Sequence, residues 1–208
     1  MIELHHLNNS RSQRVLWLLE ELDLPYSIVR YEREPTMFAP ESLKKIHPLG
    51  KSPVIKDGER VVAESGVILE YLLETHGGGR FVPAAGSEAF RKYRYWMHYA
   101  EASLMPQLLL KMYTGRIGDA ARTVADRIDS QIRLHLDFVE SELSGEYLAS
   151  NEFSAADIQM SFPLEVASAQ RVLTDKHPKL KSLLQRLHAR PAYQRALEKG
   201  GPNAYAKD

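Results

Sequence analysis

One adjacent pair of residues, Glu64 and Ser65, has the chemistry to hold a small zwitterion. The pair follows the apolar segment Arg60–Ala63 and precedes a stretch of helical character from Gly66 to Glu74. A serine at a helix N-cap, with unbonded backbone amides behind it, forms a small anion site. The Glu64 carboxylate beside it would accept an ammonium group. Together the two side chains suit the head group of an α-amino acid, which carries both charges.

A proline precedes this pair at the head of a second apolar segment, Pro53-Val54-Ile55. Proline has no backbone N–H and is therefore tolerated at the first residue of a strand. A cis Ser52–Pro53 bond at this position would turn the chain sharply. The segment therefore reads as the start of a strand that enters through a tight turn.

Composition excludes several classes of function. The chain has 208 residues, equal numbers of acidic and basic residues and no cysteine. A net charge near zero argues against a dedicated nucleic-acid binder, which normally carries a basic field. No apolar run approaches the roughly 18 residues that a membrane span needs, and the N-terminus has no basic-then-apolar signal, so we expect a cytoplasmic protein. Without cysteine there is no disulfide, Cys-x-x-Cys redox centre or cysteine nucleophile, so any reactive thiol must arrive with the substrate.

The histidine pair His5-His6 raises the question of a metal site. Adjacent residues of a strand point to opposite faces of the sheet, so these two imidazoles cannot chelate one ion together. We therefore predict no metal.

The first part of the chain alternates strand and helix signals. Apolar residues between positions 12 and 22 recur at helical spacing, and Asp57-Gly58 favours a hairpin turn. We predict strands at 2–7, 26–31, 53–55 and 60–63 and helices at 12–22, 41–46 and 66–74. The order βαβαββα is the plan of the thioredoxin fold, which we place in residues 1–77.

The glycine- and proline-rich residues 78–87 form the clearest linker in the chain. Strand signals vanish beyond it, and residues 88–208 predict an all-helical domain. We expect helices at 88–113 (bent near Pro106), 120–143, 154–172, 180–188 and 192–198. Ser154 and Asp157 form a capping box at the start of the third of these. The expected fold is α/β plus all-α, a thioredoxin-like N-terminal domain followed by a helical bundle.

Four motifs, in this order and at these spacings, resemble the soluble glutathione S-transferases. They are Asn9-Ser10-Arg11-Ser12-Gln13-Arg14, Lys44-Lys45-Ile46-His47-Pro48-Leu49-Gly50-Lys51-Ser52-Pro53, Ala63-Glu64-Ser65-Gly66 and Phe153-Ser154-Ala155-Ala156-Asp157-Ile158. The resemblance covers nearly the whole chain and is strongest to the fungal and bacterial subgroup typified by a yeast enzyme. It implies glutathione as co-substrate, a homodimer and a second substrate that is an electrophile.

The resemblance also implies how glutathione would be held. Glu64 and Ser65 would bind the γ-glutamyl ammonium and carboxylate. The backbone of Ser52, ahead of a cis Pro53, would pair with the cysteinyl unit. Lys51 is suited to the glycyl carboxylate, and the alternatives for that role are His47 and Arg33.

In this family the loop after the first strand supplies a Tyr, Ser or Cys that stabilises the glutathione thiolate. The chain has no tyrosine before Tyr26 and no cysteine, so we expect Ser10 to be the catalytic residue, with Ser12 or the side-chain amide of Asn9 as alternatives. A free thiol has a pKa of about 8.5 and is mostly protonated at neutral pH. Lowering that pKa by roughly two units needs about 2.7 kcal/mol, which a charge-assisted hydrogen bond of roughly 1.5–3 kcal/mol can supply.

The electrophile pocket is expected on the long helix after the linker, where apolar side chains recur. Its candidate residues are Met105, Leu109, Met112 and Tyr113, with Tyr99 and Arg116 as candidates to polarise the electrophile. The expected function is conjugation of glutathione to a partly apolar electrophile. The alternatives are a glutathione-dependent peroxidase or isomerase, and a non-catalytic transferase-like binding or assembly module. A complete set of Ser10, Glu64 and Ser65 favours an enzyme.

Overall fold

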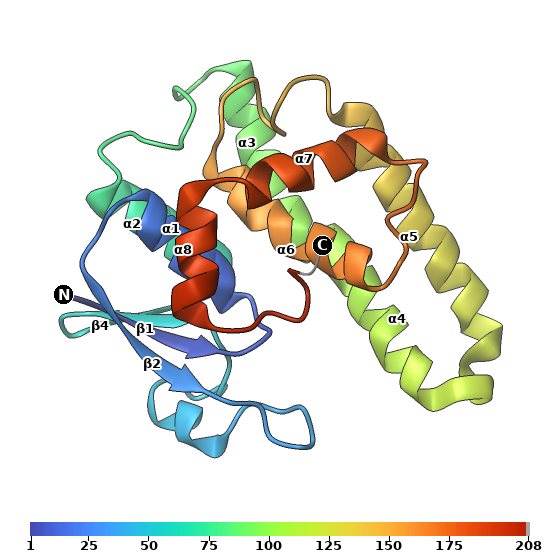
Figure 1. Cartoon of the computed structure of the whole chain (residues 1–208), viewed down its shortest axis with the longest axis horizontal. Helices are drawn as coiled ribbons and strands as arrows, with labels where there is room; N and C mark the ends of the chain where they lie inside the picture. Colours follow the sequence, from blue (N-terminus) through green and yellow to red (C-terminus); the bar gives the residue numbers. More distant parts are fainter. Residues whose placement is uncertain (207–208) are drawn as a thin grey trace. The chain divides into compact units, whose positions relative to one another are not determined.

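A four-stranded mixed sheet organises the N-terminal part of the molecule (Figure 1). The structure, a computed structural model, describes residues 1–206 of the chain. The strands are β1 (Ile2–Leu7), β2 (Tyr26–Tyr31), β3 (Val54–Asp57) and β4 (Arg60–Ala63), in the spatial order β2-β1-β3-β4. β1 and β2 are parallel and joined through α1 (Ser12–Glu21), whereas β3 is antiparallel to both β1 and β4. The predicted strands and the thioredoxin-like order are confirmed.

Two local predictions in this part of the chain need correction. The helix predicted at 41–46 is a 3₁₀-helix, Glu41–Lys45, whose i→i+3 bond joins Leu43 N–H to Pro40 O over 3.1 Å. Prolines at 40 and 48 leave too few residues between them for an α-helix to propagate. The helix α2 (Ser65–His76) begins at Ser65, so Ser65 is not its N-cap. Glu64 holds that position because its carbonyl accepts the first helical bond, from Ile68 N–H at 2.8 Å.

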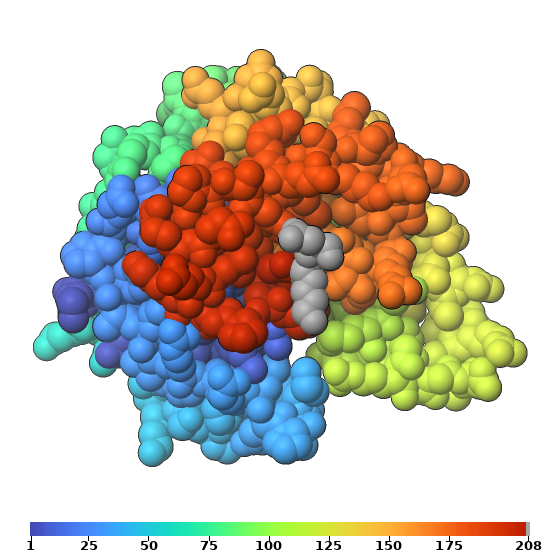
Figure 2. All heavy atoms as spheres, viewed as in Figure 1, coloured from blue at the N-terminus to red at the C-terminus, as the bar shows by residue number. Residues whose placement is uncertain are grey.

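By their contacts, the described residues divide into two compact units. One contains residues 1–82 and the chain from His188 onward, and the other contains residues 83–187. The sequence predicts one helical domain over 88–208, but the last helix, α8 (Pro191–Gly200), packs on α1 instead. Figure 2 shows this C-terminal segment, in red, against the blue N-terminal residues. The domain boundaries proposed from the sequence stay a prediction. The contacts assign α8 to the same compact unit as the sheet.

Aromatic and ionic contacts hold α8 on α1. Trp17 and Tyr193 meet edge to face with ring centroids 5.0 Å apart. Arg190 binds Glu21 through two hydrogen bonds of 2.6 and 2.9 Å. The neighbouring Glu20 accepts hydrogen bonds from the side chains of Lys199, Arg195 and Tyr26. These partners follow residue 188 in the chain or belong to the sheet, so no local pattern links them to α1.

The second unit is helical throughout its regular structure, as predicted. Its helices are α3 (Glu88–Tyr99), α4 (Met105–Ile117), α5 (Arg122–Glu142), α6 (Ala155–Ala169) and α7 (Pro178–His188). A π-helical segment, Ala100–Leu104, joins α3 to α4. The interruption lies one turn before Pro106 because proline lacks an N–H and clashes with the carbonyl four residues earlier.

Helix α6 forms the centre of this unit, and every residue from Ala155 to Ala167 is buried. The predicted capping box at its start is confirmed: Asp157 accepts from Ser154 N–H at 2.9 Å, and its other oxygen accepts from Leu148 N–H at 2.9 Å. Burial raises the pKa of Asp157 to about 6, against the lowering effect of these hydrogen bonds. The box therefore also fixes the loop that precedes α6.

Candidate functional site

Three loops meet at one end of the sheet. β1 ends there, β3 begins there and β4 ends there, because His5 is paired with Val54 and Val54 is paired with Ala63. The loop after β1, the turn before β3 and the acid–serine pair after β4 therefore lie next to one another. The sequence-predicted glutathione residues fall on these three segments, which are up to 56 residues apart in the chain. Antiparallel pairing on either side of β3 brings them together.

The turn before β3 has the predicted cis bond between Ser52 and Pro53. Ser52 Oγ donates a 2.9 Å hydrogen bond to the His5 backbone carbonyl, which ties the turn to β1. Pro53 is buried and Lys51 is exposed. The role of Lys51 toward a glycyl carboxylate stays a prediction. Of its two alternatives, Arg33 is engaged in the loop after β1, where it donates to the Asn9 carbonyl at 3.1 Å.

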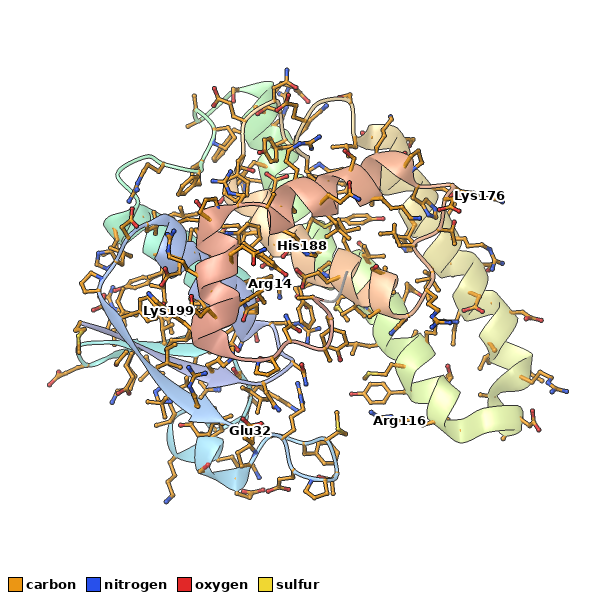
Figure 3. All side chains as sticks on the ribbon, viewed as in Figure 1. Arg14, Glu32, Arg116, Lys176, His188 and Lys199 are labelled. Carbon is orange, nitrogen blue, oxygen red and sulfur yellow. The ribbon has the colours of Figure 1, made fainter. Side chains whose placement is uncertain are left out.

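At the acid–serine pair, the backbone of Glu64 lies in the left-handed region, with φ of 69°. A non-glycine residue in this region is uncommon, and such residues cluster at ligand-binding sites. Ser65 is buried at the first turn of α2, and its Oγ accepts a 2.9 Å hydrogen bond from Arg14 Nη2. Arg14, labelled in Figure 3, extends from α1 and is only 1% exposed. A buried cation and a helix N-terminus thus meet at Ser65, and both favour a bound anion.

In the loop after β1, two serine hydroxyls lie in contact. Ser10 Oγ is 2.8 Å from Ser12 Oγ and accepts the Ser12 backbone N–H at 3.2 Å. Ser12 Oγ is also 2.9 Å from His6 Nδ1 and 3.2 Å from the Leu7 carbonyl. Ser12 is fully buried and bonded back to β1, whereas Ser10 is 6% exposed. Of the two serines, Ser10 is therefore the more exposed, and its role toward a thiolate stays a prediction.

Asn9 turns the chain between β1 and Ser10, with a backbone φ of 49°. Asparagine tolerates this left-handed conformation better than most residues. Its side-chain Oδ1 accepts a 2.7 Å hydrogen bond from the Ala204 backbone N–H, so the segment after α8 is anchored to this loop. Because the oxygen is engaged, the amide nitrogen is the group that Asn9 could offer to a thiolate.

The predicted electrophile residues all lie on α4 in the second unit. Met105 is buried, Leu109 and Met112 are half-buried, and Tyr113 is exposed. Their contact with an electrophile stays a prediction. Tyr99, a candidate to polarise that substrate, is bonded through its hydroxyl to His135 Nδ1 at 2.5 Å, and burial raises its pKa far above the usual range. Tyr99 therefore stays a neutral phenol.

Sequence reasoning assigned no role to two residues that the structure brings into the site. Arg14 had a signal, since it is a charged residue among the buried apolar positions of α1, four residues after Ser10. His6 had none, because its contact with Ser12 depends on how the loop folds back over β1. Both side chains are buried. Arg14 is bonded to Ser65, a predicted glutathione-binding residue, and His6 is bonded to Ser12, the alternative to Ser10.

Comparison with known proteins agrees with this arrangement. Residues 1–74 match the family described as the N-terminal domain of glutathione S-transferase, and residues 97–191 match its C-terminal domain. The chain belongs to the glutathione S-transferase family. The family predicted from the sequence motifs is therefore confirmed.

Relatives extend over nearly the full length of this glutathione S-transferase family member. It is 33% identical to glutathione S-transferase 1 of Saccharomyces cerevisiae, over 96% of this chain and 95% of that protein. It is 38% identical to glutathione S-transferase 3 of Schizosaccharomyces pombe, over 96% of this chain and 88% of that protein. A crystal structure of a glutathione S-transferase from Actinobacillus pleuropneumoniae superposes with a TM-score of 0.88 at 35% identity, covering 98% of this chain and 94% of that one. The predicted likeness to fungal and bacterial members is confirmed.

Two further features of residues 1–206 bear on the class of protein. None of their helices is both long and apolar enough to cross a bilayer. Nor do these residues contain a group of three or more His, Asp or Glu side chains that could hold a metal ion.

Proposed function

We propose that this chain is a glutathione transferase that binds glutathione at the end of its sheet and activates the thiol for attack on an electrophile. The observation that carries the proposal is the meeting of three loops there, each with the group that one part of glutathione needs. Membership of the transferase family, over nearly the whole chain, supports the same activity.

In this proposal the γ-glutamyl end is held by charge. The Glu64 carboxylate binds the ammonium group. The carboxylate binds at Ser65 and the N-terminus of α2, where Arg14 adds positive potential at 2.9 Å from Ser65 Oγ. The Ser52 backbone pairs with the cysteinyl unit, and Lys51 binds the glycyl carboxylate.

The thiol then lies beside Ser10, at the N-terminal end of α1. A hydroxyl hydrogen bond and the positive end of a helix both stabilise a thiolate over a thiol. Ser10 Oγ accepts the Ser12 backbone amide, which fixes its position. Stabilisation of roughly 1.5–3 kcal/mol would lower the thiol pKa by about one to two units.

Ser10→Ala provides the test, with Ser130→Ala on the exposed face of α5 as the matched control. We expect the wild type to be retained on immobilised glutathione and to conjugate glutathione to an aryl halide. Ser10→Ala should be retained but lose at least about tenfold in kcat, the equivalent of about 1.4 kcal/mol. Retention without turnover by either protein would favour the binding-module alternative. Turnover only with an organic hydroperoxide would favour a peroxidase.

We further infer a cytoplasmic homodimer, as is typical of this family. Family membership supports this inference. Light scattering after gel filtration tests the dimer, for which a mass twice the 23.6 kDa of one chain is expected.

A further inference from the structure

The segment that follows α8 returns to the loop after β1. In Figure 1 it is the red loop beyond the end of α8. The Ala204 backbone N–H donates a 2.7 Å hydrogen bond to Asn9 Oδ1, across 195 residues of sequence. Both residues belong to the first compact unit. Because Asn9 immediately precedes Ser10, a segment near the C-terminus is bonded directly to the loop that is proposed to activate the thiol.

The end of α8 is held in place, which determines where this segment starts. Arg30 on β2 donates hydrogen bonds to the carbonyls of Lys199 and Gly200, the second at 2.9 Å. Gly201 then ends the helix with a backbone φ of 84°, a conformation that glycine adopts more readily than residues with a side chain. The segment therefore leaves the helix from a fixed point and in a fixed direction.

A tight turn over residues 203–206, the C-terminal turn, presents the Ala204 N–H to the loop. The Ala206 N–H bonds to the Asn203 carbonyl at 3.3 Å, and Asn203 Oδ1 accepts the Tyr205 N–H at 3.0 Å. Asparagine is favoured at the first position of such a turn because its side chain accepts a backbone N–H two residues further on. Neither of these bonds uses the Ala204 N–H, which is therefore available to Asn9.

Asn9 is held from two sides. Arg33, in the loop after β2, donates to the Asn8 and Asn9 carbonyls at 3.2 and 3.1 Å. The Ala204 N–H holds the Asn9 side chain, and since a backbone N–H can only donate, it also fixes which way the amide is turned. The backbone φ of Asn9 is 49°. Conformations of this kind persist where the surrounding structure holds them.

The conformation of Asn9 sets the direction in which the chain enters Ser10. Ser10 Oγ accepts the Ser12 backbone N–H at 3.2 Å, so its position depends on the path of this loop. A change of conformation at Asn9 would therefore move the Ser10 hydroxyl relative to a bound thiol. A misplacement of about 1 Å is enough to reduce a rate by about 100-fold.

We propose that the C-terminal turn is a positioning element of the active site, which acts on the thiolate by holding Asn9 and, through it, the Ser10 hydroxyl. This proposal rests on the proposed function. Ala204 contributes its backbone N–H and not its side chain, which is exposed. Activity should therefore depend on the presence of an N–H at position 204 and not on the side chain there.

The substitution Ala204→Pro tests this role, because it removes the N–H and is compatible with the turn. Ala204 is the second residue of the turn, where proline is favoured. The matched control is Ala204→Ser, which keeps the N–H at the same exposed position. The readouts are the pKa of the glutathione thiol in the enzyme complex, from the ultraviolet absorbance of the thiolate, and kcat and KM with an aryl halide.

In Ala204→Pro we expect kcat to fall by about fivefold or more, and the bound thiol pKa to rise by about half a unit or more toward the free value of about 8.5. The KM for glutathione should change little, because no group proposed to bind the tripeptide is altered. Ala204→Ser should behave as the wild type. Asn203→Gly, which removes the side-chain bond of the turn, should change kcat and the thiol pKa in the same direction and serves if Ala204→Pro does not fold.

A double-variant cycle with Asn9→Ala shows whether the turn acts through Asn9. Asn9→Ala removes the oxygen that accepts the Ala204 N–H. Ala204→Pro should therefore cause no further loss of kcat in that background. Losses that add in the double variant would refute the proposed route from the turn to Ser10.

The outcomes separate this proposal from the proposed function. A wild type that neither binds glutathione nor lowers its thiol pKa would refute the function itself. A wild type with a lowered thiol pKa that Ala204→Pro and Asn203→Gly leave unchanged would refute the positioning role alone. A rise in the KM for glutathione without a change in kcat or in the thiol pKa would likewise refute it, and would show that the turn supports only the binding of glutathione.

Discussion

Arg14 Nη2 donates a 2.9 Å hydrogen bond to Ser65 Oγ, across 51 residues of sequence. The bond joins the first turn of α1 to the first residue of α2 and places a buried guanidinium at a helix N-terminus. Because Ser65 is one of the residues proposed to bind the γ-glutamyl carboxylate, Arg14 strengthens that site electrostatically without being exposed itself.

Replacing Arg14 should weaken glutathione binding. In Arg14→Met the dissociation constant measured by calorimetry is expected to rise by about tenfold or more, because hydrogen bonds to charged groups contribute about 1.5–3 kcal/mol. Arg122→Met, at a side chain 81% exposed on α5, is the control and should bind normally. Normal affinity in a folded Arg14→Met protein would contradict the role given to this cation.

The role of Glu64 can be tested against its proposed partner atom. Glu64→Gln should weaken the binding of glutathione by about 1–2 kcal/mol, because a charge-assisted hydrogen bond to the ammonium group is lost. An analogue of glutathione without the α-amino group should bind the wild type and the variant equally. If the variant binds glutathione and the analogue more weakly by the same factor, Glu64 supports the conformation of the loop and does not bind the ammonium group.

His6 should make stability fall on mild acidification. Its pKa is about 4 in the folded protein and 6.5 as a free group, so the unfolded chain takes up the proton first as the pH falls. The contribution is fully present above pH 6.5 and lost by about pH 4, and it amounts to about 3 kcal/mol.

Asp157 contributes with the opposite sign, since burial raises its pKa from 3.8 to about 6. The measurement is therefore the difference between wild type and His6→Gln in the free energy of unfolding, obtained by urea titration at several pH values. The wild type should lose stability relative to the variant as the pH falls from 6.5 to 4. A constant difference over that range would be inconsistent with a buried neutral His6.

The ion pair between Arg190 and Glu21 should stabilise the docking of α8. Arg190→Met leaves the mostly buried Glu21 carboxylate without this partner, and we expect the free energy of unfolding to drop by about 3 kcal/mol. The double variant with Glu21→Gln should recover part of the loss, because no charge is then left buried and unpaired. Wild-type stability in Arg190→Met would show that the ion pair adds little to the packing of Trp17 on Tyr193.

Periodicity and turn chemistry were enough to predict most elements. The strand at 2–7 and the helix that follows it came from local apolar spacing, and the start of α6 came from Ser154 and Asp157, which bond to each other within four residues. Two details were predicted incorrectly. Residues 41–45 form a 3₁₀-helix and not an α-helix because prolines flank them, and the N-cap of α2 is Glu64 and not Ser65 because the Glu64 carbonyl accepts the first helical hydrogen bond.

Motifs and hydrophobic spacing are local, so they were enough to predict the family, the order of elements and the residue types of the proposed glutathione site. Three contacts became visible only in the folded chain: α8 packs on α1, Arg14 donates a hydrogen bond to Ser65, and His6 is hydrogen-bonded to Ser12. These contacts depend on strand register and on side chains that meet only when the chain closes on itself. No spacing along the sequence encodes them.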